Sequence, residues 1–245
     1  MDQVSVTAAS GLQSRMEALD IVANNLANTT TGGFKLDREF YSLFTAADNE
    51  GDSASTKLPL IQKQWTDFSQ GVLTPTGSAL DLARSGKGFF AVNGPSGPLY
   101  TRNGSFQLSS SGQLTTSDGY AVRDASGQPI QTQSQAPIEV GADGSLTQSG
   151  ETLGQLQIVD FQDRSALQKL GNSYFSVNDP KIQPISAPDT TVQQGKVENS
   201  NVAPAESAVR LVGLMRQFEM LQKAITITTD MNKQALTEVA RVSGG

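Results

Sequence analysis

The sequence predicts an α+β protein in which an antiparallel, β-rich central domain is flanked by one helix at each end of the chain. Two observations lead to this prediction. Near both ends, apolar residues recur at alternating spacings of three and four, the period of a helix that packs along one face. Between the ends, short apolar runs alternate with Asn-Gly, Asp-Gly and Ser-Gly pairs, which is typical of strands joined by tight turns.

The N-terminal helix is expected over residues 3–28. The Gly32-Gly33 pair lies just beyond it, and glycine is the residue that most often follows the last turn of a helix. The apolar positions follow a heptad spacing, which is the pattern of a row that packs against another helix. This row consists of Leu12, Met16, Leu19, Ala23 and Leu26.

The C-terminal helix is expected over residues 204–242, with Pro204 in the first turn, where proline is tolerated. It would be about 58 Å long, roughly 19 Å longer than the N-terminal helix. A single partner helix would therefore leave part of its apolar row exposed, and such patches usually mark interfaces. The row consists of Leu211, Leu214, Phe218, Leu221, Ile225, Thr228, Asn232, Ala235, Val239 and Val242.

We therefore predict that the terminal helices pair in a coiled-coil-like layer and associate with copies of the same chain. Residues 1–35 and 197–245 would form a helical assembly domain, and 36–196 a central β domain. The acidic, apolar-poor stretch 45–57 is expected to be a mobile loop. The expected strands are 89–92, 105–108, 120–122, 155–159 and 174–177.

Composition excludes several classes of function. The 245 residues carry a net charge of −6, so no basic face for nucleic acid is expected. Cysteine and histidine are both absent, which removes disulfides, Cys/His metal sites and histidine-dependent catalysis. No run of 18 apolar residues is present, so no membrane insertion is expected, and residues 1–5 lack the features of a secretory signal. We expect no catalytic residue, no metal and no cofactor.

Some residues nevertheless leave a second class of function open. Asp118, Asp124, Asp143, Asp160 and Asp163 could supply a pair of carboxylates for glycoside hydrolysis, and Trp65 with Phe68 could stack on a sugar. The alternative function is thus a cell-wall-acting hydrolase or a carbohydrate-binding β domain. The 85–88 segment, Ser-Gly-Lys-Gly, only partly matches a phosphate-binding loop and is better explained as a turn before a strand.

Three blocks of sequence resemble the bacterial flagellar rod and hook proteins. They are residues 23–35 (ANNLANTTTGGFK), residues 86–114 (including GKGFFAV, YTRNGSF and GQL), and residues 197–223 (VENSNV, then RQFEM and Lys223). Phe218 stands where tyrosine is common in the family, and Gly32 where a bulkier residue is usual. The blocks occur in the family's order, and segments 65–71 and 76–83 favour a proximal over a distal rod subunit.

The resemblance implies a structural subunit of the hollow flagellar rod, exported unfolded by the flagellar type III apparatus without a cleaved signal peptide. Its partners would be copies of itself and the other proximal and distal rod subunits, in the periplasmic part of the basal body. Its helices would form an inner layer around the export channel. In the assembly interface we include Asn24, Asn25, Asn28 and Phe34, with Asn232 and Val239 from the C-terminal row.

Overall fold

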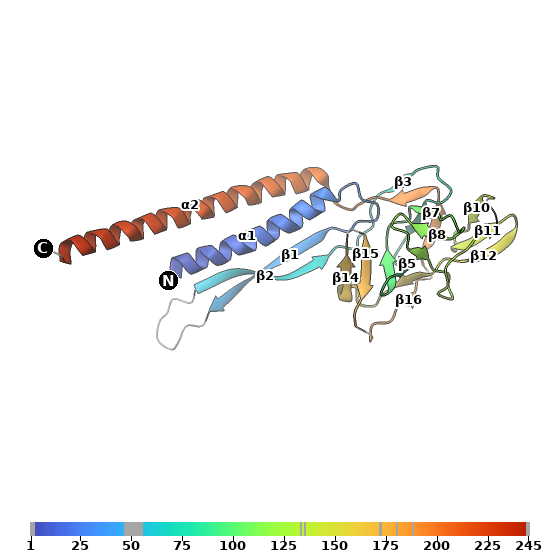
Figure 1. The fold of residues 1–245 in the computed structure, drawn as a ribbon, viewed down its shortest axis with the longest axis horizontal. Coiled ribbons are helices and arrows are strands. Elements are labelled where there is room, and N and C mark those ends of the chain that lie inside the picture. Colours follow the sequence, from blue (N-terminus) through green and yellow to red (C-terminus); the bar gives the residue numbers. More distant parts are fainter. Residues whose placement is uncertain are drawn as a thin grey trace. The chain divides into compact units, whose positions relative to one another are not determined.

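A computed structural model describes the protein over residues 3–46, 56–132, 134, 136–171, 173–179, 181–187 and 189–243. The chain divides into two compact units (Figure 1). The first contains Met1–Ala27, Asp37–Trp65 and Ala203–Gly245, and the second contains Asn28–Leu36 and Thr66–Val202. The sequence-based division differs from this one, because it placed 37–65 with the central domain and both 28–35 and 197–202 with the helices.

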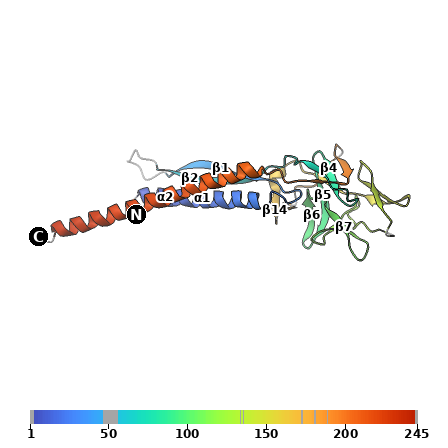
Figure 2. The ribbon, with the colours of Figure 1, turned by 90° about the horizontal axis from the view of Figure 1, so that it is seen from above.

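The first unit contains the two terminal helices, α1 (Gln3–Ala27) and α2 (Pro204–Ser243). Both helices are confirmed, each to within one residue of the predicted ends. They lie side by side (Figures 1 and 2), with Ala18 and Val22 of α1 buried against Leu214 of α2. Since α1 has 25 residues and α2 has 40, α2 is longer by about 22 Å at 1.5 Å per residue.

The first unit also contains a two-stranded sheet that the sequence patterns missed. It pairs β1 (Asp37–Ala46) with β2 (Thr56–Thr66). No Asn-Gly or Asp-Gly turn signal separates these strands, and that signal was the basis for expecting strands elsewhere. The ends of the predicted 45–57 loop belong to β1 and β2, and its middle, 47–55, lies outside the described residues.

The second unit is built around a nine-stranded sheet. Its main path runs β14-β15-β6-β5-β9-β8-β7, and β13 joins β5 and β16 beside it. All of the pairings are antiparallel. These strands are β5 (Phe89–Gly94), β6 (Gly97–Thr101), β7 (Phe106–Leu108), β8 (Leu114–Thr116), β9 (Ala121–Val122), β13 (Ile158–Asp160), β14 (Leu167–Leu170), β15 (Tyr174–Val177) and β16 (Ile185–Ser186).

Three smaller sheets complete this unit. One has three strands in the order β10-β11-β12, and the other two pair β17 with β4 and β18 with β3. A short 3-10 helix spans Arg164–Ala166. The strands are β3 (Leu73–Pro75), β4 (Leu82–Ser85), β10 (Ile138–Val140), β11 (Ser145–Gln148), β12 (Glu151–Gln155), β17 (Thr191–Gln194) and β18 (Lys196–Glu198).

Strand β5 lies between two apolar clusters. Phe90 and Val92 belong to the larger cluster, while Phe89 and Ala91 belong to a second cluster with Phe161 and Phe175. Successive side chains of a strand point to opposite faces, so the uninterrupted apolar run 89–92 is buried on both sides. This strand therefore holds the two halves of the core together.

The predicted strands are largely confirmed. Runs 89–92, 105–108, 120–122 and 174–177 fall on β5, β7, β9 and β15. The run 155–159 is broken instead, because β12 ends at Gln155 and β13 begins at Ile158. The turn glycines Gly112, Gly119, Gly127 and Gly144 all have φ near +80° (77 to 85°), the conformation that their dipeptides predicted.

Candidate assembly surface and buried junction

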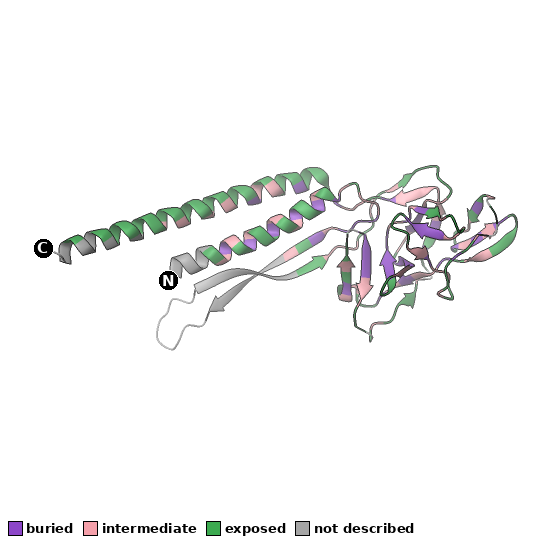
Figure 3. Ribbon diagram, in the orientation of Figure 1, coloured by how far each residue is buried: buried purple, intermediate pink, exposed green. Residues whose placement is uncertain are grey.

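The first six residues of the apolar row predicted on α2 lie on the face that α2 turns toward α1, whereas Ala235, further along the row, is exposed. Leu214 is buried, and Leu211, Phe218, Leu221, Ile225 and Thr228 are half-buried. Every other residue from Met215 to Met231 is exposed (Figure 3). We call these six residues the inner row. The three-and-four spacing of these residues therefore serves the contact between α1 and α2 of the same chain.

The buried row of α1 is displaced by about one residue from the predicted row. Among residues 9–27 of α1, the buried ones are Gly11, Ser14, Ala18, Val22 and Asn25. Of the predicted residues, Met16 and Ala23 are exposed, and Leu12, Leu19 and Leu26 are half-buried. Small side chains at 11, 14 and 18 allow a close approach of α2; a methyl group on Gly11 would lie 3.8 Å from the Leu221 side chain. Apolar periodicity alone could not identify this face, because glycine and serine add little to it.

Several exposed apolar residues lie on a different face of α2, with Arg216 and Lys223 on the same side. Val209, Met220, Ile227 and Met231 are 75%, 64%, 52% and 64% exposed. Their separations of 11, 7 and 4 residues place them on one helix face, and we call them the outer row. Single exposed apolar residues are ordinary, whereas a row of them on one face marks an interface. The sequence analysis missed this row, although the seven-residue spacing from Met220 to Ile227 was a usable signal.

Three residues assigned to the assembly interface lie inside the chain's own fold. Asn25 is buried and forms two hydrogen bonds with the Asp37 backbone, donating to its oxygen at 2.8 Å and accepting from its nitrogen at 2.9 Å. Asn28 accepts a hydrogen bond from the Thr31 hydroxyl at 3.0 Å. Phe34 is fully buried, with the Lys169 ammonium 3.7 Å from its ring centre.

The remaining predicted interface residues are placed differently. Asn24 is exposed on α1. The side chains of Asn232 and Val239 lie outside the described residues.

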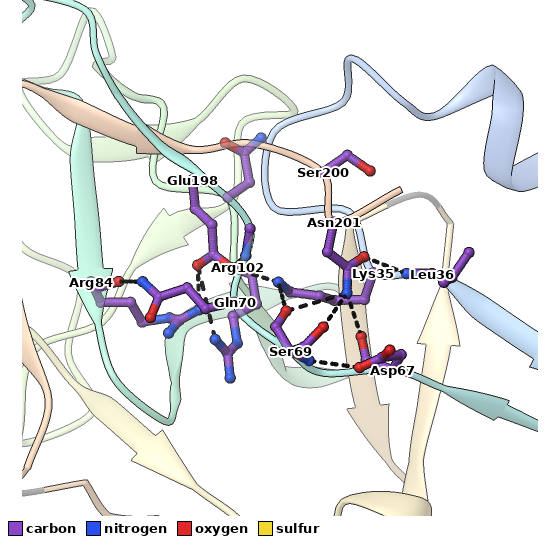
Figure 4. Close-up of polar contacts among 12 residues, drawn as sticks. Lys35, Leu36, Asp67, Ser69, Gln70, Arg84, Arg102, Glu198, Ser200 and Asn201 are labelled. Carbon is purple, nitrogen blue, oxygen red and sulfur yellow. Dashed lines mark hydrogen bonds and ion pairs between the residues drawn. The ribbon is translucent and has the colours of Figure 1, made fainter. Parts of the chain in front are cut away.

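A buried ion cluster joins the segment after α1, which carries Lys35, and β18, which carries Glu198, to Arg84 of β4 and to Arg102 just after β6. We call Lys35, Arg84, Arg102 and Glu198 the junction cluster; each is at most 1% exposed. The Glu198 carboxylate accepts hydrogen bonds from Lys35 at 2.5 Å and from Arg84 at 2.6 Å, and Arg102 lies 3.9 Å away (Figure 4). One carboxylate is thus surrounded by three cations. A buried charge needs such partners because desolvation is costly.

Asn201 connects the same segments through hydrogen bonds. Its side-chain oxygen accepts from the Leu36 nitrogen at 2.8 Å, and its side-chain nitrogen donates to the Asp67 oxygen at 2.8 Å and to the Ser69 hydroxyl at 3.0 Å (Figure 4). Three stretches that are far apart in the sequence are therefore joined by one amide.

Gly33 allows the close approach that this junction needs. Its nitrogen donates to the Glu198 backbone oxygen at 2.7 Å, and its φ is +69°. A Cβ at this position would lie 2.2 Å from the Asn103 nitrogen, so no other residue fits without a backbone shift.

Burial makes Lys35 the titratable group of the cluster. Desolvation lowers the pKa of Lys35 from 10.5 to about 8, although Glu198 raises it. The unfolded chain keeps this proton to higher pH than the folded chain, so stability rises as the pH increases from 8. We expect a gain of about 2 kcal/mol in unfolding free energy between pH 7 and about pH 9.5. Urea unfolding at pH 7 and 9.5 measures this gain.

The matched variant for this pH effect is Lys35→Met, in which the rise is expected to disappear. Unfolding free energies that do not rise with pH in the wild type, or that rise equally in the variant, would contradict the assignment to Lys35.

The carboxylates considered for hydrolysis are occupied by structural contacts. Asp124, Asp143 and Asp163 each accept hydrogen bonds from a serine two residues later, and Asp118 accepts from the Tyr174 hydroxyl at 2.6 Å. Asp160 holds Arg164 through two bonds of 2.7 and 2.9 Å. Hydrogen bonds from Ser145 lower the pKa of Asp143, whereas a catalytic acid needs a raised pKa.

Of the two aromatic candidates for sugar binding, Phe68 packs edge-on against Phe89 and Phe175. Trp65 is 45% exposed, with the Arg38 guanidinium carbon 5.8 Å from its ring centre. The 85–88 segment forms the predicted turn, between β4 and β5. Among the described residues, no helix is apolar enough over a sufficient length to cross a membrane. No group of three or more acidic side chains within the same described residues could hold a metal ion.

The long pair of terminal helices, together with candidate carboxylates that are engaged in turns and ion pairs, is typical of a structural protein. Three flagellar family models match this chain, and together they cover more than half of its residues. Residues 6–35 match the flagella basal body rod protein family, 83–148 match the flagellar hook protein FlgE/F/G D1 domain, and 193–238 match the C-terminal domain of the flagellar basal body rod FlgEFG proteins.

Similar proteins cover nearly the whole chain. The flagellar basal-body rod protein FlgF of Caulobacter vibrioides is 32% identical, with 99% of this chain and 100% of the relative aligned. The rod protein FlgG of Buchnera aphidicola subsp. Schizaphis graminum is 34% identical over 94% of this chain and 96% of its own length. FlgG of Bacillus subtilis is 30% identical over 95% of this chain and 97% of its own length. The chain therefore belongs to the flagellar basal-body rod protein family, with relatives of both the FlgF and the FlgG type.

Proposed function

We propose that this chain is a rod subunit that assembles through its terminal segments, 1–35 and 197–245, into the hollow shaft that transmits torque. Membership of the rod family supports a structural role in the basal body. The observation that carries the assembly proposal is the outer row of α2. Its residues Val209, Met220, Ile227 and Met231 are exposed to solvent in the single chain, and exposed apolar residues on one helix face favour binding to another helix.

The geometry of α2 indicates how subunits would share load. The inner row packs on α1 of the same subunit, and the outer row would pack on a helix of a neighbouring subunit. Met16, Ala23 and Asn24 would extend this contact on the exposed side of α1. Many such contacts along a shaft would spread shear over a large buried area instead of a few bonds.

The shaft's inner layer would be formed by the helices and would surround a channel for export substrates. We propose copies of this chain, other rod subunits and the flagellar type III export apparatus as partners. The chain would reach its periplasmic position through that apparatus, without a cleaved signal peptide.

A deletion of the gene, complemented by the wild-type chain, tests this proposal. We expect basal bodies from the deletion strain to lack a complete rod in electron micrographs, and the complemented strain to recover it. Intact rods in the deletion strain would contradict the proposal. Release of soluble fragments when the pure chain is incubated with cell wall would instead favour the hydrolase alternative.

A further inference from the structure

A pocket of about 470 Å³ opens beside the junction cluster. Its lining combines cationic and polar groups, namely Ser69, Gln70, Gly86, Lys87, Arg102 and Arg164, with Phe68 as the apolar wall. Figure 4 shows Arg102 together with Gln70 and Ser69. The turn 85–88 thus reaches this pocket through Gly86 and Lys87, although its sequence does not match a phosphate-binding loop.

The Arg102 side chain has donors that the described residues leave unused. Its Nε and Nη1 atoms are buried and have no hydrogen-bond acceptor among the described residues. The nearest carboxylate oxygen, on Glu198, is 3.9 Å from Nη1, too far for a hydrogen bond. The Phe89 ring, whose centre lies 4.7 Å from the guanidinium carbon, holds the group in place. A fixed guanidinium with free donors is suited to binding a carboxylate or a phosphate group.

Charge around the pocket is unbalanced. Within the junction cluster, one carboxylate faces three cations, which leaves an excess of two positive charges. Arg164 is paired with Asp160, and Lys87 adds a further positive charge at an exposed position. This local excess occurs in a chain whose net charge is −6. Desolvation lowers the pKa of Arg102 to about 10, as expected for a buried cation with too little negative charge nearby.

We propose that this pocket binds an oxyanion, either a carboxylate or a phosphate group, with Arg102 as the central donor. Arg102 would offer the bonds that Glu198 is too distant to accept. Lys87 would contribute charge at the entrance, and Ser69 and Gln70 would contribute polar groups at the side. The bound anion would offset the excess charge of the junction cluster and so stabilise the second unit.

Isothermal titration calorimetry of the full chain tests this proposal, with sodium phosphate in one arm and sodium acetate in the other, both at constant ionic strength set by chloride. We expect saturable binding of one anion per chain in at least one arm, and the stronger arm identifies the chemistry. Lys87→Gln should weaken binding by about threefold to tenfold, since one charged contact is lost. Lys181→Gln, at an exposed lysine that does not line the pocket, should leave it unchanged.

A second variant, combined with a measurement of folding, distinguishes a loss of binding from a loss of structure. Arg102→Gln removes the central donor and should abolish binding, and circular dichroism reports whether it is folded. If it does not fold, Lys87→Gln and Arg164→Gln, both at positions with solvent access, carry the test. Absence of saturable binding in both arms would overturn the proposal. Binding that persists at full strength in Lys87→Gln and Arg164→Gln would overturn it as well.

Discussion

Ile227→Asp is expected to abolish rod assembly while leaving the isolated subunit as stable as the wild type. Ile227 belongs to the outer row and is 52% exposed, so a carboxylate there remains hydrated in the monomer. In the assembled rod the same carboxylate would be buried against a neighbouring helix without a partner, at a cost of several kcal/mol at each contact. Urea unfolding of the pure chain and electron microscopy of basal bodies measure the two effects.

The chain provides a matched control two residues away. Ile225 belongs to the inner row and is half-buried in the α1–α2 contact. Ile225→Asp should therefore lower the stability of the first unit, by about 2–4 kcal/mol, because an unpaired carboxylate would lie in an apolar contact. If Ile227→Asp assembles normally, the outer row is not a contact between subunits. If both variants destabilise the monomer equally, the two rows do not have separate roles.

Glu198→Gln is expected to destabilise the second unit strongly. Glu198 supplies the only negative charge within the junction cluster, and its two oxygens accept from Lys35, Arg84 and the Gly71 nitrogen. Removing the charge leaves three buried cations without compensation. Breaking a buried ion pair on one side typically costs about 3–5 kcal/mol. Urea unfolding monitored by circular dichroism measures this loss.

Two further variants separate the charge effect from a general effect of substitution. Glu151→Gln changes an exposed glutamate and should shift stability by less than about 0.5 kcal/mol. Glu198→Gln combined with Lys35→Met removes one cation as well, and should recover part of the loss, which a double-mutant cycle quantifies. Equal stabilities of Glu198→Gln and Glu151→Gln would mean that the junction cluster does not hold the fold.

Local periodicity was sufficient to predict the helices and most of the central strands. Both helices have a spacing of three and four that extends over many turns, and the run 89–92 is apolar enough to be buried on both faces. Strands β1 and β2 were missed because no turn dipeptide separates them. The contact face of α1 was displaced because Gly11, Ser14 and Ala18 are small residues, which carry little hydrophobic signal.

The junction cluster could not be predicted from residue patterns. Lys35 and Glu198 are 163 residues apart, and Arg84 is 114 residues from Glu198. Nothing in their local sequence indicates that these charges meet in a buried site. Only the resemblance to the rod family drew attention to the segments that carry Lys35, Arg102 and Glu198, and it gave no reason for their charge. That reason lies in tertiary packing.

Cysteine cross-linking in purified basal bodies tests the central claim most directly, because the natural sequence has no cysteine to compete. Met220→Cys places a thiol on the outer row, and Leu214→Cys places one at a buried position of the inner row. With a short bifunctional maleimide and further single cysteines on exposed α1 or α2 positions, we predict adducts between subunits through residue 220 and none through residue 214. Adducts through 214, or none through 220 in intact rods, would contradict the account.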